Sequence, residues 1–148
     1  MTKAPHLKTF LWFKGNLEEA LAFYSKTFPG TEIHSLNHSA DTLLTAEFSI
    51  FGHRILAMNF EGGPKFNDSI SLSITCDGQD EVDRYWNALT EHGTAGQCGW
   101  LVDEFGLSWQ VTPLQLQDWL GHSDPQVASY AMKAMRGMNK IVIDELHA

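Results

Sequence analysis

The chain has 148 residues, 43% of them hydrophobic and 19% charged, which is typical of one globular domain with a buried core and excludes a disordered chain. Its formal net charge of −8, with no stripe of Lys and Arg, excludes a nucleic-acid backbone as partner. No segment approaches the roughly 20 apolar residues of a membrane span, and the first residues show no signal-peptide pattern, so we expect a cytoplasmic protein without a membrane partner.

The first half of the chain predicts a strand, a helix and three more strands. An apolar run at 7–13 has the length of a strand. Apolar residues then recur at helical spacing, with Asn16 as the expected N-cap, Glu19 three residues later and Pro29-Gly30 as the stop. Strands are expected next at 32–36, 42–50 and 54–60.

The second half predicts the same elements in the same order. A strand at 69–76 alternates polar and apolar residues. The helix that follows carries apolar residues from Val82 to Leu89 at the spacing of the first helix, and His92-Gly93 ends it. Two further strands are expected at 97–101 and 107–112.

These repeated elements predict an α+β fold built from two βαβββ modules. A Phe-Gly turn leads into a strand in each half, at Phe51-Gly52 and at Phe105-Gly106. We place the modules at about 5–63 and 68–113, within one domain spanning 5–113.

A helical tail is expected at 114–148. It holds an apolar stretch at 114–120 and, after Ser123-Asp124-Pro125, a helix with one apolar stripe from Val127 to Met138. Such a stripe needs a surface to cover it, so we expect the tail to pack on the domain or on a partner chain, and we predict a homodimer.

The segment from Gly15 to Tyr24 and the segment from Cys98 to Pro113 resemble the vicinal oxygen chelate superfamily, which includes glyoxalases, bleomycin-resistance proteins and dioxygenases. Within it the chain is similar to the PhnB-like branch, which carries the domain label 3-demethylubiquinone-9 3-methyltransferase. The resemblance covers nearly the whole chain, including 134–141 of the tail. It implies strands bent into a cup and, in the metal-using members, four His or Glu ligands around one divalent ion.

The positions that match those ligands carry none of these residue types. They fall near Thr9, at Leu56 or Ala57, at Ser71 and at Gln110. The strands expected at 7–13, 54–60, 69–76 and 107–112 contain no His, Asp or Glu, so we expect no metal at this site. The chain also has no glycine-rich turn followed by an acidic residue, as a nucleotide-bearing cofactor needs, and we expect no cofactor.

The concave face of the second sheet is expected to be polar and uncharged. If Ile70, Leu72 and Ile74 pack on the helix, the alternate residues of that strand face the concavity, and the same parity applies to the last strand. The predicted ligand-binding residues are Trp12, Asn59, Phe66, Ser71, Ser73, Trp100, Ser108 and Gln110, with Asp103 and Glu104 at the rim.

Two functions remain open at this point. The first is a PhnB-like protein that binds a small organic ligand in the concave sheet without a metal. The alternative is a lyase, isomerase or dioxygenase with a displaced metal site, or with Asp103 or Glu104 as general base. A water-filled groove without a ligand and a pure interaction module are the further readings, and the sequence does not name the ligand.

Overall fold

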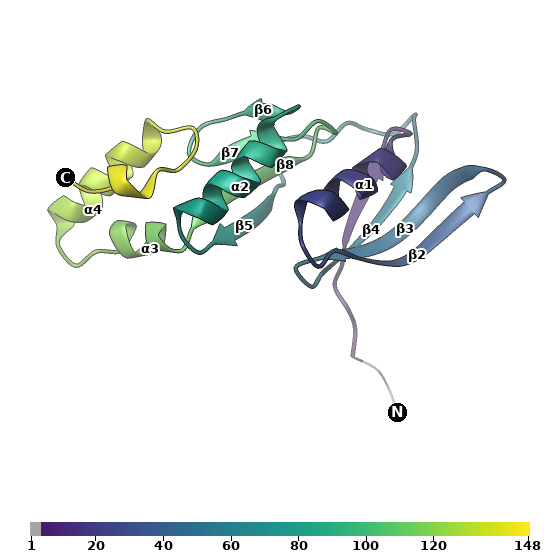
Figure 1. Ribbon diagram of the computed structural model, residues 1–148, viewed down its shortest axis with the longest axis horizontal. Coiled ribbons are helices and arrows are strands. Elements are labelled where there is room, and N and C mark those ends of the chain that lie inside the picture. The colour runs from purple at the N-terminus through teal and green to yellow at the C-terminus, as the bar shows by residue number, and fades with distance from the viewer. Residues whose placement is uncertain (1–3) are drawn as a thin grey trace. The chain divides into compact units, whose positions relative to one another are not determined.

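The computed structural model describes residues 4–148 (Figure 1). The chain divides into two compact units, Met1–Lys65 and Phe66–Ala148. No helix in the described part of the chain is long and apolar enough to cross a membrane. Each unit has its own four-stranded sheet, packed against a helix that lies between its first two strands in the chain.

Unit 1 contains the first predicted module. Its elements are β1 (Thr9–Phe13), α1 (Leu17–Thr27), β2 (Glu32–Ser39), β3 (Thr42–Ile50) and β4 (His53–Asn59). The strands form one sheet in the order β1-β4-β3-β2, in which β1 runs parallel to β4 and the other pairs are antiparallel. Helix α1 buries Leu17, Ala20, Leu21 and Tyr24, so its apolar stripe packs as the helical spacing predicts.

Unit 2 repeats this arrangement. It contains β5 (Leu72–Cys76), α2 (Gln79–Thr90), β6 (Thr94–Ala95), β7 (Trp100–Val102) and β8 (Ser108–Pro113). The sheet order is β5-β8-β7-β6, with β5 parallel to β8, so the topology matches that of unit 1. The two βαβββ modules predicted from the sequence are confirmed (Figure 1).

The predicted strand at 97–101 is wrong in its first half. Cys98 and Gly99 have φ angles of 58° and 82°, in the left-handed region that a strand does not use. The chain turns at these two residues, so the structure has a short β6 at Thr94–Ala95 and a separate β7 from Trp100. A side chain at Gly99 would also lie 2.8 Å from the Val111 carbonyl oxygen.

Asn16 occupies the N-cap position of α1, as predicted, but its side chain makes no capping hydrogen bond. Its Oδ1 is buried without a hydrogen-bond partner among the described residues. Instead Asn59, at the end of β4, accepts a hydrogen bond from the Leu17 N–H at 3.0 Å and donates one to the Leu43 carbonyl at 2.9 Å. A residue distant in sequence therefore satisfies one of the N–H groups that the start of a helix leaves unpaired.

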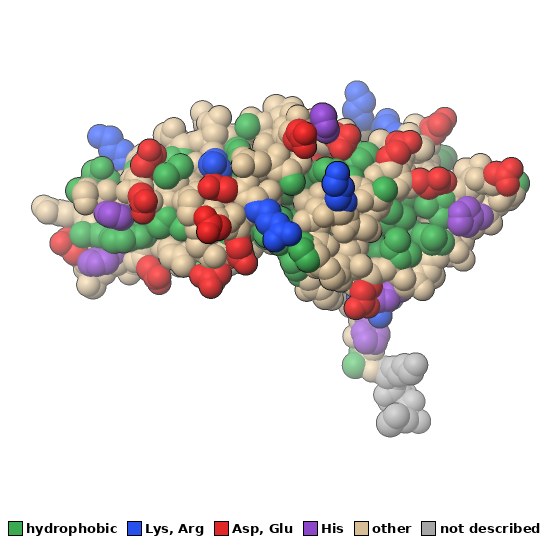
Figure 2. All heavy atoms as spheres, viewed as in Figure 1, with side chains coloured by type: hydrophobic (Ala, Val, Ile, Leu, Met, Phe, Trp, Pro, Cys, Tyr) green, Lys and Arg blue, Asp and Glu red, His purple; other side chains and the backbone are tan. Residues whose placement is uncertain are grey.

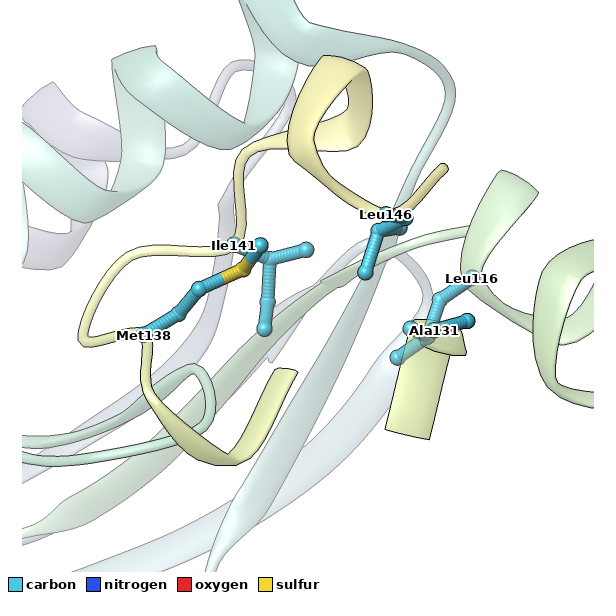
Figure 3. Close-up of a cluster of buried hydrophobic side chains, with 5 residues drawn as sticks. All are labelled: Leu116, Ala131, Met138, Ile141 and Leu146. Carbon is cyan, nitrogen blue, oxygen red and sulfur yellow. The ribbon is translucent and has the colours of Figure 1, made fainter. Parts of the chain in front are cut away.

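The tail forms α3 (Gln115–Leu120), α4 (Pro125–Arg136) and a short 3₁₀ helix η1 (Ile143–Glu145). Figure 3 shows the buried cluster that holds these pieces together, made of Leu116, Ala131, Met138, Ile141 and Leu146. The buried part of the α4 stripe thus packs against other tail residues of the same chain. This packing does not require a second chain, so the stripe by itself is not an argument for a dimer.

Backbone hydrogen bonds and several side chains, among them Gln79, join the tail to the rest of unit 2. The Cys98 and Gly99 N–H groups donate to the carbonyls of Met138 and Asn139, both at 2.8 Å. The Gln79 amide bonds the tail backbone twice, donating to the Ile141 carbonyl at 2.9 Å and accepting from the N–H of residue 143 at 2.7 Å. These bonds pair backbone groups that would otherwise be left without partners.

Asp103 organises the turn between β7 and β8. Its carboxylate, only 3% exposed, accepts hydrogen bonds from the N–H groups of Phe105 and Leu107 and from Trp109 Nε1, at 2.9 to 3.0 Å. Trp109 is itself 2% exposed and packs in the core. Charge-assisted bonds to buried donors are among the stronger hydrogen bonds in proteins.

Replacing Asp103 with Ala should lower the free energy of unfolding by about 3 kcal/mol, because it leaves buried donors unsatisfied. Urea denaturation followed by circular dichroism measures the change. The neighbouring Glu104, which is exposed, provides the control: Glu104→Ala should shift the midpoint little. Equal stability of the two variants would contradict the structural role of Asp103.

Candidate functional site

One face of the unit 2 sheet is covered by α2 and the other carries polar side chains. Ile74, Trp109 and Val111 are buried on the covered side. The alternate residues point to the opposite side, which we call the open face of unit 2 and define by Ser71, Ser73, Thr75, Trp100, Gln110 and Thr112. The alternation predicted for these strands is confirmed within β5 and β8, since strand residues alternate between the two faces of a sheet. The prediction for Ile70 is wrong: β5 begins only at Leu72, and Ile70 is exposed before it instead of packing on the helix.

Gln110 lies at the centre of this open face. It stands opposite Ser73 of β5 on one side and Trp100 of β7 on the other, so the three form one row across three strands. Its Nε2 donates a hydrogen bond to Ser71 Oγ at 3.1 Å. Trp100 is 36% exposed. The row therefore combines an aromatic surface with an amide and hydroxyl groups, without any charged side chain.

Ser108 and Phe66 lie at one end of this sheet. Unlike the residues of the row, they are covered by other parts of unit 2. Ser108 is only 1% exposed, and its hydroxyl donates to Asp68 Oδ1 at 2.8 Å. Phe66 is half-buried next to the Phe105-Gly106 turn, where a Cβ on Gly106 would lie 3.8 Å from its ring. The segment before β5 thus covers Ser108, which sequence parity alone does not show.

Trp12 and Asn59 belong to unit 1. Trp12 is 39% exposed on β1, and its ring meets Phe60 edge-on with centroids 5.7 Å apart. Asn59 uses its side-chain amide to bond the backbone at Leu17 and Leu43. Of the eight predicted ligand-binding residues, four lie together on the open face of unit 2: Ser71, Ser73, Trp100 and Gln110.

Glu47 is a candidate site residue that the sequence analysis missed. It lies on β3, opposite Leu56, on the face of the unit 1 sheet that α1 leaves uncovered. Phe10, Ser35 and Thr45 line the same depression, whose volume is about 220 Å³. A signal was present in the sequence, because Glu47 interrupts an otherwise apolar and hydroxyl-bearing run at 42–50.

Two cations hold the Glu47 carboxylate. Lys8 Nζ lies 3.0 Å from one carboxylate oxygen, and Arg54 donates to the other. The hydrogen bond from Lys8, followed by the charges of Lys8 and Arg54, lowers the pKa of Glu47 below its ordinary value. A carboxylate held in this way is ionised at neutral pH and is a weak proton acceptor, which argues against a role as general base.

The carboxylate at Asp103 is equally unsuited to proton transfer, since both of its oxygens already accept hydrogen bonds. Glu104 is exposed in the turn beside it. The structure thus offers no support for Asp103 as the general base of the enzyme hypothesis. Asp103 stabilises the turn, and its side chain is buried there.

The metal-ligand positions of the resembled superfamily do not fit a divalent ion in this chain. Thr9 lies on the helix-covered side of β1 and its hydroxyl bonds His53 Nε2 at 2.8 Å; Ala57 is also on the covered side, while Leu56 is on the other. Ser71 and Gln110 supply only neutral oxygen and nitrogen atoms. Within residues 4–148, no three His, Cys, Asp or Glu side chains lie close enough to hold a metal.

Residues 5–112 match the protein family described as 3-demethylubiquinone-9 3-methyltransferase. A solved structure of the PhnB protein from Bacillus cereus is 28% identical, covers 74% of this chain and 99% of its own, and gives a TM-score of 0.67. Protein PA1353 from Pseudomonas aeruginosa is 22% identical, covers 73% and 98%, and gives 0.61.

The fosfomycin resistance protein FosX from Listeria monocytogenes shares the fold. It is 15% identical, covers 74% of this chain and 91% of its own, and gives a TM-score of 0.55. No curated protein matches the chain. The family match ends at residue 112, before α3, so the helical tail lies beyond it.

The ion pairs of Glu47 predict a pH-dependent contribution to stability. Because the pKa of Glu47 is lowered in the folded chain, its contribution is present above the pKa of an unfolded glutamate and is lost as the pH falls through the folded value. Glu47→Gln should therefore be less stable than the wild type at pH 7 and approach it at strongly acidic pH. Chemical denaturation at a series of pH values measures this difference.

Lys8→Gln tests whether the ion pair with Lys8 causes the pH-dependent stability contribution of Glu47. Since the Lys8 hydrogen bond is the largest influence on Glu47, the pH-dependent stability change caused by Glu47→Gln should shrink in the Lys8→Gln background. A change that is the same at every pH, or that persists fully without Lys8, would contradict the assignment.

Proposed function

The chain belongs to the 3-demethylubiquinone-9 3-methyltransferase family, the PhnB-like branch with the vicinal oxygen chelate fold, and from this membership we propose that it binds a small organic molecule on the open face of unit 2 without a metal ion. The main support for this proposal is the row of Ser73, Gln110 and Trp100 across three neighbouring strands. An exposed indole beside an amide and hydroxyls is the usual lining of a site for a small polar, partly aromatic ligand.

The polar groups of this row set the strength of binding. Each hydrogen bond from Ser71, Ser73 or Gln110 to a neutral ligand contributes on the order of 1 kcal/mol net, because the ligand gives up bonds to water. Stacking on Trp100 adds a similar amount. No charged side chain belongs to the row, so the proposal favours an uncharged ligand over an anion or a metal chelate.

We propose binding without a metal ion because of the side chains that stand at the superfamily's metal-ligand positions. One structure of FosX is described as a complex with Mn(II) and sulfate. In this chain the matched positions carry Thr9, Leu56 or Ala57, Ser71 and Gln110, and neutral hydroxyl, amide and alkyl groups do not offset the dehydration of a divalent ion. The family description does not extend to a methyl transfer here, since the sequence has no glycine-rich turn for a nucleotide-bearing cofactor.

A thermal-stability screen of the purified chain against small aromatics, quinones and antibiotics tests the proposal, because a ligand that binds only the folded state raises the melting temperature. Metal analysis of the same preparation accompanies it. We expect stabilisation by an uncharged organic compound and no stoichiometric metal. Stoichiometric zinc, nickel, manganese or iron held by the β1, β4, β5 and β8 strands would contradict the metal-free proposal.

Gln110→Ala should weaken binding of the best compound about fivefold, since it removes one hydrogen bond of about 1 kcal/mol. The fold should persist, because Gln110 is only half-buried. Isothermal titration calorimetry measures the affinity. Gln117→Ala, at an exposed position of α3, is the matched control and should bind like the wild type. Unchanged affinity of Gln110→Ala would place the ligand elsewhere.

We also propose a homodimer. The support comes from the uncovered face of unit 1, where the exposed Phe10 and Trp12 of β1 stand beside Leu56 and Met58 of β4. Neighbouring apolar side chains at a surface of this kind often mark an interaction site. Sedimentation velocity at micromolar concentration should give the mass of two chains. A single species of one chain would contradict the proposal.

A further inference from the structure

The tail contains a depression of about 400 Å³ that is separate from the open face of unit 2. Its lining residues are Trp119, Asp124, Gln126, Val127, Tyr130, His147 and Ala148. Figure 2 shows a strip of hydrophobic side chains between two histidines over the tail, with Asp and Glu side chains nearby. Because the tail follows the family match, this depression is not explained by the proposed function.

Flat rings form one wall of the depression. The imidazole of His147 stacks on the indole of Trp119, with centroids 4.7 Å apart and planes 24° apart. The His122 ring, which is not among the lining residues, lies almost parallel to the same indole, at 6.3 Å and 10°. Tyr130, which is 49% exposed, adds a third aromatic lining residue. Parallel rings at a partly apolar surface favour a flat ligand that extends the stack.

Two polar groups of the lining, both on exposed residues, make no hydrogen bond to the protein within residues 4–148. Asp124 Oδ1 accepts a hydrogen bond from the Gln126 N–H at 2.9 Å, whereas its Oδ2 makes no hydrogen bond or ion pair. The Tyr130 hydroxyl also makes none. A carboxylate oxygen of this kind accepts a bond from an N–H donor, and an ionised acceptor binds a charged donor most strongly.

The charge of the lining favours a cation. It contains one carboxylate side chain, Asp124, and one imidazole, His147, which counts as neutral at pH 7, and neither Lys nor Arg. The N-terminal end of α4 contributes only about half a positive charge, less than the full negative charge of Asp124. That carboxylate already occupies the place at the helix end that an anion would take, because it caps the Gln126 N–H.

From these observations we propose that the Trp119–Tyr130–His147 depression of the tail binds a small planar aromatic cation, such as an aromatic amidine, with its charged nitrogen on Asp124 and its ring against the stacked side chains. Stacking on aromatic rings and charge pairing both act on such a ligand. The proposal is independent of the open face of unit 2, and nothing in the family match assigns a site to the tail.

Benzamidine is the probe and benzamide is its neutral counterpart of nearly the same shape. Ligand-observed NMR and calorimetry on the full chain should show binding of benzamidine and at least tenfold weaker binding of benzamide. Equal binding of the two compounds, or no binding of benzamidine at millimolar concentration, would overturn the proposal.

Asp124→Asn is the matched variant, because asparagine still caps the start of α4 while the charge is removed. It should weaken benzamidine binding about tenfold without lowering the melting temperature markedly. Asp41→Asn, an exposed change in the turn before β3, controls for net charge and should bind like the wild type.

Tyr130→Leu tests the aromatic lining and should also weaken binding several-fold. Gln110→Ala should leave benzamidine binding unchanged, which separates this site from the proposed open-face site. Benzamidine affinity that survives in both Asp124→Asn and Tyr130→Leu would overturn the proposal, whatever the outcome at the open face.

Discussion

One helix for each four-stranded sheet is the constraint on which the rest of the structure depends. A helix covers one face of such a sheet, and the residues of every strand alternate between that face and the other. In unit 1 the covered face holds Phe13, Phe48 and Ile55, all nearly inaccessible; in unit 2 it holds Trp109 and Val111. The opposite faces are therefore left for side chains whose chemistry is not set by packing, and both candidate sites on the sheets lie there.

The two uncovered faces differ in a way that affects their chemistry. In unit 2 the central residue is the uncharged Gln110, whose amide donates a hydrogen bond to the Ser71 hydroxyl. The row around Gln110 carries no charged side chain. In unit 1 the central residue is the carboxylate of Glu47, which Lys8 and Arg54 neutralise. A paired and solvated ion cluster resists displacement by a neutral ligand, since each charge would lose its partner. The neutral face is consequently the better candidate for binding an uncharged organic molecule.

Local periodicity predicted the modules, both helices and the parity of β5 and β8, because these features depend on residues three, four or two positions apart. Local periodicity could not predict contacts between residues that are distant in the sequence. The side-chain amide of Asn59 bonds the backbone at Leu17 and Leu43. The Ser108 hydroxyl donates a hydrogen bond to Asp68, which lies 40 residues earlier in the sequence. In both cases a predicted ligand contact is a structural hydrogen bond. The left-handed turn at Cys98 was also missed, since that backbone conformation is uncommon for a residue other than glycine.

The tail shows how helices can be added to a βαβββ module without altering its sheet. Its backbone bonds the turn at 98–99 before β7 and the side chain of Gln79 on α2. Ser73 and Trp100 of the Ser73–Gln110–Trp100 row remain exposed. The buried cluster of the tail is formed largely from its own residues. Substitutions on the outer surface of the tail therefore change neither the row nor its strand pairing. A second ligand site on that surface is physically compatible with the first, because the two share no side chain.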